Sequence, residues 1–227
     1  LGGKENDPTA TGNISNFLEA NEIHLHEMAV VRVKDHDAAS YDTITELNQP
    51  TYRPDFTPSD VESADCLITT TPRIAIFLPI ADCVATVLHD PVHNVLALAH
   101  LGRHSSIAKL AQKLVKYMQA HHQSHPDNVV VWMAPSIKSS HYVLKYADFL
   151  KNDPDWQDYY KKSKEGFSLD LQMYNKKLFE TVGVRPENIY ISAINTATDS
   201  NYWSHFTETT VKRNNPPSRF GVVAMLK

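Results

Sequence analysis

Short apolar segments bounded by turn residues dominate the sequence between residues 65 and 100. Three of them are DCLITT (65–70), RIAIFLPI (73–80) and NVLALAH (94–100). They are too short for stable helices and rich in Ile, Val and Leu, so we predict that they are β-strands. The last is apolar throughout, which is typical of a strand buried on both faces. Pro79 predicts a bulge or an edge position near the end of the second strand, because proline has no amide hydrogen to donate.

Similar segments recur along the rest of the chain and alternate irregularly with helical patterns. Further strands are predicted at 28–33, 128–137, 188–194 and 220–226, and helices at 13–23, at 105–122 with Ser105 or Ser106 as N-cap, and from the cap Ser168 to the terminator Gly183. Residues 45–62 and 151–166 are predicted to be a surface loop and a polar excursion. Because the alternation is not strict, we expect an α+β fold with mixed β-sheets and flanking helices.

Composition narrows the classes of function. The 227 residues carry a net charge of −4 and are 42% hydrophobic, so we expect one globular domain over 1–227 and no nucleic-acid partner. No apolar stretch approaches the ~20 residues of a membrane span, and the first residues do not have the layout of a signal peptide. We therefore expect a cytoplasmic protein with no membrane partner. No glycine-rich nucleotide loop of the GxGxxG type occurs.

Two side chains with metal-binding or nucleophilic chemistry lie at the ends of predicted strands. Cys83 follows the segment that ends at residue 80, and His100 closes the strand 94–100. Two cysteines in the whole chain cannot form a disulfide framework. Zinc prefers Cys sulfur and His nitrogen, and a catalytic zinc site has three protein ligands and one open position. A Cys–His pair could instead serve as a nucleophile and its base. The spacing alone does not separate these alternatives.

The segment ADCLITTTPRIAIFLPIADCVATVLHDPVHNVLALAHLGRH (64–104) resembles the core signature of the YfiH/laccase-domain family, also called multicopper polyphenol oxidoreductase-like. APSIKSSHYVL (134–144) and SRFGVVAML (218–226) resemble later motifs of that family. The resemblance extends over most of the chain from about residue 13. It implies a YfiH-like single domain, although the N-terminal strand region of the family is mostly missing from this sequence.

The resemblance also implies a mononuclear zinc site, with copper as the alternative metal. Its ligands would be His36, Cys83 and His100. The motif KDHD, which contains His36, follows a predicted strand as the family's first histidine does. His24 and His26 are rival candidates, but they precede that strand.

The implied activity is phosphorolysis of purine nucleosides: adenosine, inosine, guanosine or methylthioadenosine, with adenosine deamination as a further activity. Cys83 and His100 would then be catalytic as well as metal-binding. Nucleoside and phosphate would be the small-molecule partners. Phosphorolysis requires an anion to be held against the ribose, so basic residues should line the site. Arg103 and Arg219 are the candidates for substrate binding.

The sequence departs from the family pattern mainly at groups expected to bind the anion. GRHS (102–105) replaces the family's GWRG, Asn195 replaces a cysteine, and SHFT (204–207) lacks two arginines. The metal site is therefore better preserved than the substrate site. Three other functions stay open, namely a Cys–His hydrolase or peptidoglycan-precursor editing factor, a copper-dependent polyphenol oxidase, and a non-enzymatic binding protein. For the polyphenol oxidase, a single Cys with few histidines gives no type of multicopper cluster that can be constructed.

Overall fold

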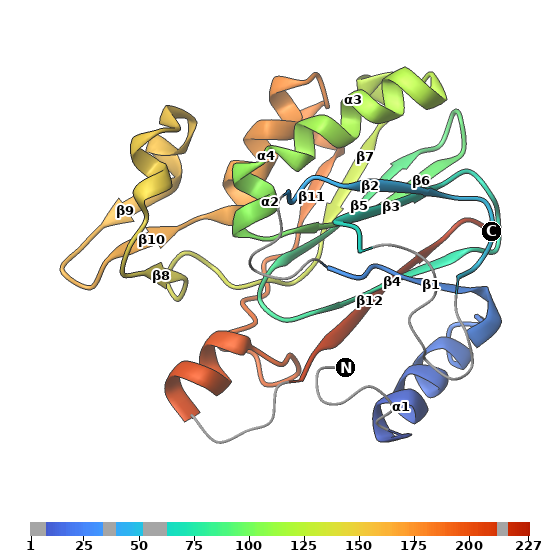
Figure 1. Cartoon of the computed structure of the whole chain (residues 1–227), viewed down its shortest axis with the longest axis horizontal. Coiled ribbons are helices and arrows are strands. Elements are labelled where there is room, and N and C mark those ends of the chain that lie inside the picture. The colour runs from blue at the N-terminus through green and yellow to red at the C-terminus, as the bar shows by residue number, and fades with distance from the viewer. Residues whose placement is uncertain (1–7, 34–39, 52–62, 213–217) are drawn as a thin grey trace.

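The computed structural model describes residues 8–33, 40–51, 63–212 and 218–227. Two sheets pack face to face, helices cover their outer faces, and a small third sheet projects from one end (Figure 1). This arrangement confirms the α+β prediction. In the described part of the chain, no helix has the length and apolar character needed to cross a membrane.

The larger sheet has six strands, and its centre carries the segment that positions the site. β6 lies between β3 and β5 and is antiparallel to both, while β2 pairs in parallel with β3. The predicted loop at 45–62 is therefore wrong at its start, because residues 45–47 form strand pairs, and residues 52–62 lie outside the described residues. In sheet order the strands are β11 (Ile189–Ile191), β7 (Val130–Met133), β5 (Val84–Asp90), β6 (Val95–Leu101), β3 (Cys66–Thr69) and β2 (Ile44–Leu47).

The smaller sheet packs on one face of the larger one. Its strands are β1 (Met28–Val30), β4 (Ala75–Ile80) and β12 (Phe220–Met225), with β4 in the middle. Apolar side chains of both sheets form one buried cluster, which includes Ile76 from β4 and Leu98 from β6. Helix α1 (Pro8–Glu19) covers the opposite face of the small sheet.

Three helices cover the other face of the large sheet. They are α2 (Arg103–Ile107), α3 (Leu110–His122) and α4 (Leu171–Thr181). The predicted continuous helix at 105–122 is wrong, because the backbone of Lys109 has a left-handed φ of 57° that separates α2 from α3. The Lys109 ammonium pairs with Asp155 at 2.6 Å, and this long-range ion pair accompanies the break.

The caps of these helices also differ from the sequence-based expectation. Gly102 is the N-cap of α2, not Ser105 or Ser106. Asp170 caps α4 by accepting a hydrogen bond from the Met173 amide at 3.0 Å, while Ser168 lies in a strand. A carboxylate is a good N-cap acceptor, which explains why it takes this position.

The segment 151–166, predicted to be a polar excursion, is largely ordered structure. It contributes β9 (Tyr160–Lys162) to a small sheet with β8 (Val143–Leu144) and β10 (Phe167–Leu169), and its Trp156 is fully buried, stacked on Tyr174 at 3.6 Å between ring centroids. One tryptophan thus fixes a hydrophilic segment to α4. The remaining elements are the 3₁₀ helices η1 (Leu25–Glu27), η2 (Pro126–Asn128), η3 (Asp148–Lys151), η4 (Pro154–Tyr159) and η5 (Pro186–Asn188), and the π-helix η6 (Thr207–Lys212).

Candidate active site and metal centre

The register of β5 against β6 places Cys83 and His100 on the same face of the large sheet. Ala85 lies directly across from His100. Cys83 is two residues before Ala85 and therefore shares its face, because side chains alternate along a strand. Leu98, two residues before His100, belongs to the cluster between the two sheets. Both candidate ligands consequently face the small sheet, away from the helices.

The absence of a Cβ at Gly102 allows Cys83 and His100 to lie close to the same point. A Cβ atom built on Gly102 would lie 3.1 Å from Cys83 Sγ, 3.1 Å from His100 Nε2 and 3.0 Å from His100 Cε1. Because both atoms lie 3.1 Å from the same point, the distance between the Cys83 sulfur and His100 Nε2 is at most twice 3.1 Å. We call the space bounded by Cys83, His100 and Gly102 the cradle. A thiolate and an imidazole that converge in this way match the ligand types that zinc prefers.

The electrostatic surroundings of these two groups affect metal binding in opposite directions, because they favour a neutral His100 ring but also keep the Cys83 thiol protonated. Burial lowers the pKa of His100 to about 4, and the charges of Arg219 and His104 contribute, so the ring is neutral near pH 7 and its lone pair is free to coordinate. Burial, assisted by Asp82, raises the pKa of Cys83 to about 11, against the lowering effect of Arg219 and Arg103. Binding of a metal to this thiol would release its proton.

Both predicted substrate-binding arginines lie near the cradle. The charge of Arg219 acts on Cys83 and on His100, and the charge of Arg103 acts on Cys83. Arg103 Nη2 lies 3.1 Å from His104 Nε2, and the His104 ring stacks on Tyr41 at 4.6 Å. The structure thus brings four of the five predicted site residues together, from three separate parts of the sequence.

Arg219 precedes β12 and reaches the site from the small sheet. Its Nη1 donates a hydrogen bond to the Ser218 carbonyl at 2.6 Å, and its guanidinium lies 5.7 Å from the centre of the Trp203 ring. Such a cation–π contact stabilises and orients an arginine.

Two further residues of the site were not predicted from the sequence. Tyr142 forms a hydrogen bond with Arg103, and burial together with the nearby Cys83 raises the pKa of its hydroxyl to about 12. Asp82 accepts hydrogen bonds from Thr196 Oγ1 and from the Phe206 amide, both at 2.7 Å. Asp82 directly precedes Cys83 in the sequence ADC (81–83), and Tyr142 lies in the family-like segment APSIKSSHYVL (134–144). These two segments could have indicated both residues.

The direction of β1 helps to decide which histidine could be the third metal ligand, His36 or one of His24 and His26. β1 runs parallel to β4, with Met28 beside Ala75 and Val30 beside Phe77, so the chain leaves β1 toward the end of β4 that leads to Cys83. His24 and His26 precede β1, at the opposite end, where their rings stack at 5.4 Å between centroids. They are therefore poor rivals. His36 lies outside the described residues, and within the described ranges no group of three or more His, Cys, Asp or Glu side chains could hold a metal ion.

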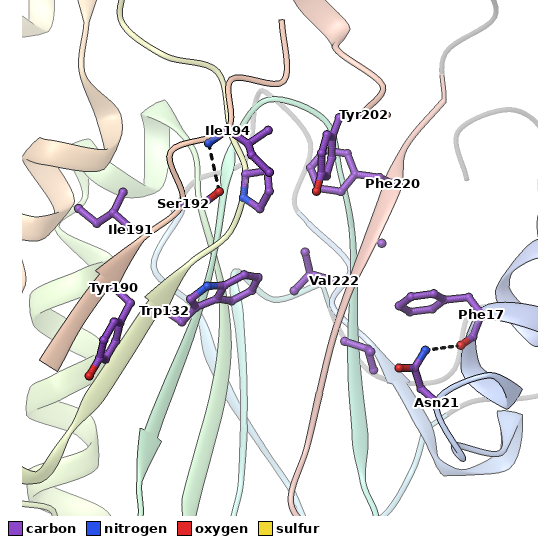
Figure 2. Close-up of a pocket in the computed structure, with 13 residues that line it drawn as sticks. Phe17, Asn21, Trp132, Tyr190, Ile191, Ser192, Ile194, Tyr202, Phe220 and Val222 are labelled. Carbon is purple, nitrogen blue, oxygen red and sulfur yellow. Dashed lines mark hydrogen bonds between the residues drawn. The ribbon is translucent and has the colours of Figure 1, made fainter. Parts of the chain in front are cut away.

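A second concave region lies on another part of the molecule. It is an open groove of about 530 Å³, bounded by β7 and β11 on one side and by α1 and β12 on the other. In Figure 2 the Trp132 ring lies between Tyr190 and Val222. The side chains of Trp132 and Tyr190 are 41% and 56% exposed. Neither Cys83 nor His100 lines it. Among the described residues, those that line it are uncharged: Phe17, Asn21, Trp132, Pro135, Tyr190, Ile191, Ser192, Ile194, Tyr202, Phe220, Gly221, Val222 and Val223.

Comparison with known families places the chain by its sequence. Residues 6–214 match the family of multi-copper polyphenol oxidoreductase laccases, and the chain belongs to this family. One relative is the purine nucleoside phosphorylase YlmD of Bacillus subtilis, 25% identical over 150 residues, which cover 64% of this chain and 54% of that protein. A purine nucleoside phosphorylase of Staphylococcus epidermidis is 22% identical over 77% of this chain and 62% of its own length. The chain thus spans less than two thirds of these relatives.

Solved structures show the same fold. YfiH of Bacillus licheniformis superposes with a TM-score of 0.81 over 95% of this chain and 80% of that protein, at 22% identity. YlmD of Geobacillus stearothermophilus gives a TM-score of 0.76 over 95% of this chain and 79% of that protein, at 20% identity. The predicted YfiH-like fold is therefore confirmed.

Proposed function

We propose that this chain is a zinc-dependent purine nucleoside phosphorylase whose active site is the cradle and the arginines beside it. The observation that carries the proposal is the convergence of Cys83 Sγ and His100 Nε2 on one point next to Gly102, with the charges of Arg103 and Arg219 nearby. Relatives named purine nucleoside phosphorylase at 22–25% identity support the same activity.

Cys83 and His100 would hold the metal together with His36. The donor set of one thiolate and two imidazoles fits zinc, and it leaves one coordination position open. Zinc bound there would supply a Lewis acid close to the reacting groups. A neutral His100 ring favours this arrangement, since a protonated ring has no free lone pair.

Arg103 and Arg219 would bind the phosphate co-substrate. Guanidinium groups form charge-assisted, frequently bidentate hydrogen bonds with phosphate oxygens. A phosphate oxygen would then form a bond to C1′ of the ribose while the bond from C1′ to the purine nitrogen breaks, and the purine leaves with a proton taken from the medium or the site. Holding the anion against C1′ lowers the barrier because the two reactants no longer need to find each other.

The test is a product assay on the purified chain. Adenosine, inosine, guanosine and methylthioadenosine are each incubated with and without inorganic phosphate, and the products are separated by chromatography. We expect free purine base and a pentose 1-phosphate in equal amounts, only when phosphate is present. Phosphate-independent formation of inosine from adenosine would reveal deamination instead, and no product from any of the four nucleosides would overturn the proposal.

Metal analysis and thiol chemistry separate this proposal from a Cys–His hydrolase. We expect one zinc per chain in protein purified without chelator. Cys83 should react slowly with an alkylating agent while zinc is bound and faster after its removal. A metal-free chain whose Cys83 reacts rapidly would favour the hydrolase, because rapid alkylation requires a thiolate of lowered pKa.

A further inference from the structure

We infer that Ser105 is a positioning residue for the metal centre, whose hydroxyl fixes the main chain that carries His100. The inference rests on the metal site of the proposed function. It concerns a side chain that is buried, with 2% of Ser105 exposed.

The hydroxyl of Ser105 connects both ends of the tripeptide His100–Leu101–Gly102. Ser105 Oγ donates to the His100 carbonyl at 2.7 Å and accepts from the Gly102 amide at 2.9 Å. The Gly102 carbonyl lies 3.2 Å from the same oxygen. β6 ends at Leu101 and α2 begins at Arg103, so the chain turns from strand to helix within this tripeptide. One buried hydroxyl therefore closes the turn that places His100.

This closure matters for the metal centre because the cradle lies at the same tripeptide. His100 supplies one donor atom, and the absent Cβ of Gly102 defines the space in which Nε2 and the Cys83 sulfur meet. A shift of the main chain at either residue would move the nitrogen relative to the sulfur. Groups that orient metal ligands without touching the metal typically contribute about 10–100-fold to metal affinity.

Ser106 provides a matched control in the same helix. It is also fully buried, but its hydroxyl accepts a hydrogen bond from Asn175 of α4 at 2.8 Å. Its bond to the tripeptide is made by its main-chain amide, which donates to the Gly102 carbonyl at 2.9 Å and is retained in S106A. Removing either hydroxyl should lower the midpoint of thermal unfolding, because each substitution removes the hydroxyl acceptor of a buried N–H group, that of Gly102 for Ser105 and one N–H of Asn175 for Ser106. Stability therefore does not distinguish the two serines, whereas metal affinity should.

The experiment measures zinc affinity by competition with a chromophoric chelator in wild type, S105A, S105G and S106A, with thermal unfolding of each. We expect the zinc Kd to rise about tenfold in S105A and S105G and to stay within about twofold of wild type in S106A. Loading with Co²⁺ gives a second readout. The sulfur-to-metal charge-transfer absorption of Cys83 should weaken or shift in the Ser105 variants and not in S106A.

Equal zinc affinity and identical Co²⁺ spectra in S105A and wild type would overturn the inference, as would equal losses in S105A and S106A. If neither Ser105 variant folds while S106A does, the hydroxyl serves the folding of the turn, and the inference fails. These outcomes are independent of catalysis. A wild type that binds zinc but yields no purine base overturns the proposed function and leaves this inference standing.

Discussion

The cradle and the open groove lined by Trp132 and Tyr190 contrast in chemistry. The groove has a volume of about 530 Å³, yet the described residues that line it carry no charged side chain. In the cradle, a thiol and an imidazole lie so close to Gly102 that an added Cβ would be 3.0–3.1 Å from them, and the charges of two guanidinium groups act on these two side chains. Large concave surfaces are the usual first hypothesis for a binding site. In this molecule the reactive groups indicate the cradle instead of this groove.

The contrast arises from where each region lies in the fold. The cradle lies where adjacent antiparallel strands of the large sheet end and face the small sheet, so side chains from both sheets reach it. The groove lies between β11 and β12, each the last strand of its sheet, together with α1. At the strand ends, side chains from different segments lie close together, whereas the groove is lined mainly by apolar side chains at the edges of the two sheets.

The substitution C83A should have the largest effect of those that test this contrast. It removes the proposed thiolate ligand, so we expect zinc content to fall well below one per chain and phosphorolysis to become undetectable. This loss is larger than the ~10–100-fold loss expected when a group that only orients a metal ligand is removed. Elemental analysis and the product assay measure these. In the control C66A, the other cysteine is removed on the helix side of β3, at a cost of about 1 kcal/mol with zinc retained. Full zinc content in C83A would contradict the assignment.

Removal of the guanidinium of Arg219 should affect phosphate more than the nucleoside. We expect R219A to raise the KM for phosphate about 10–100-fold, the equivalent of one lost charge-assisted hydrogen bond, with a smaller change in kcat. Steady-state kinetics with phosphate as the varied substrate measures this. R185A is the control, since Arg185 pairs with Asp127 at 3.2 Å on the exposed surface. An unchanged phosphate KM in R219A would remove this arginine from the substrate site.

A methyl group in the cradle should have a more moderate effect. In G102A the new Cβ would lie 3.0–3.1 Å from the His100 ring and the Cys83 sulfur, closer than ordinary contact, so one of the two must move. We expect zinc affinity to fall about tenfold. G12A is the matched control, because no atom lies within 4 Å of its added Cβ in α1, and it should stabilise the chain by about 0.5–1 kcal/mol. Undiminished zinc affinity in G102A would show that the cradle tolerates the methyl group.

The smallest effect is expected in the groove. W132A removes the exposed ring at its floor, and we expect zinc content and kcat/KM to remain within about twofold of wild type, as for most partly exposed sites away from the chemistry. Activity and thermal unfolding are measured together. A tenfold loss of kcat/KM without a matching loss of stability would place the groove in the active site and abolish the contrast.

Sequence reasoning located the strands and the candidate residues better than it located the helix ends. Apolar runs are local signals, so the strands that contain residues 66–69, 75–80 and 95–100 were predicted correctly. The break at Lys109 is accompanied by an ion pair with the distant Asp155, and the buried Trp156 stacks on the distant Tyr174; no local pattern indicates either feature. The same limit applies to Tyr142, whose contact with Arg103 arises only from packing.

By itself, the sequence determined which residues have the chemistry for a metal site and where strands end beside them. Cys83 and His100 were candidates because a thiol and an imidazole follow apolar segments, and family resemblance added Arg103 and Arg219. Only the tertiary structure decided that these four meet, since the register of β5 on β6 and the packing of β12 against β4 join distant segments. Strand register depends on the side chains of the partner strand and on burial of a whole face, and neither can be deduced from one segment alone.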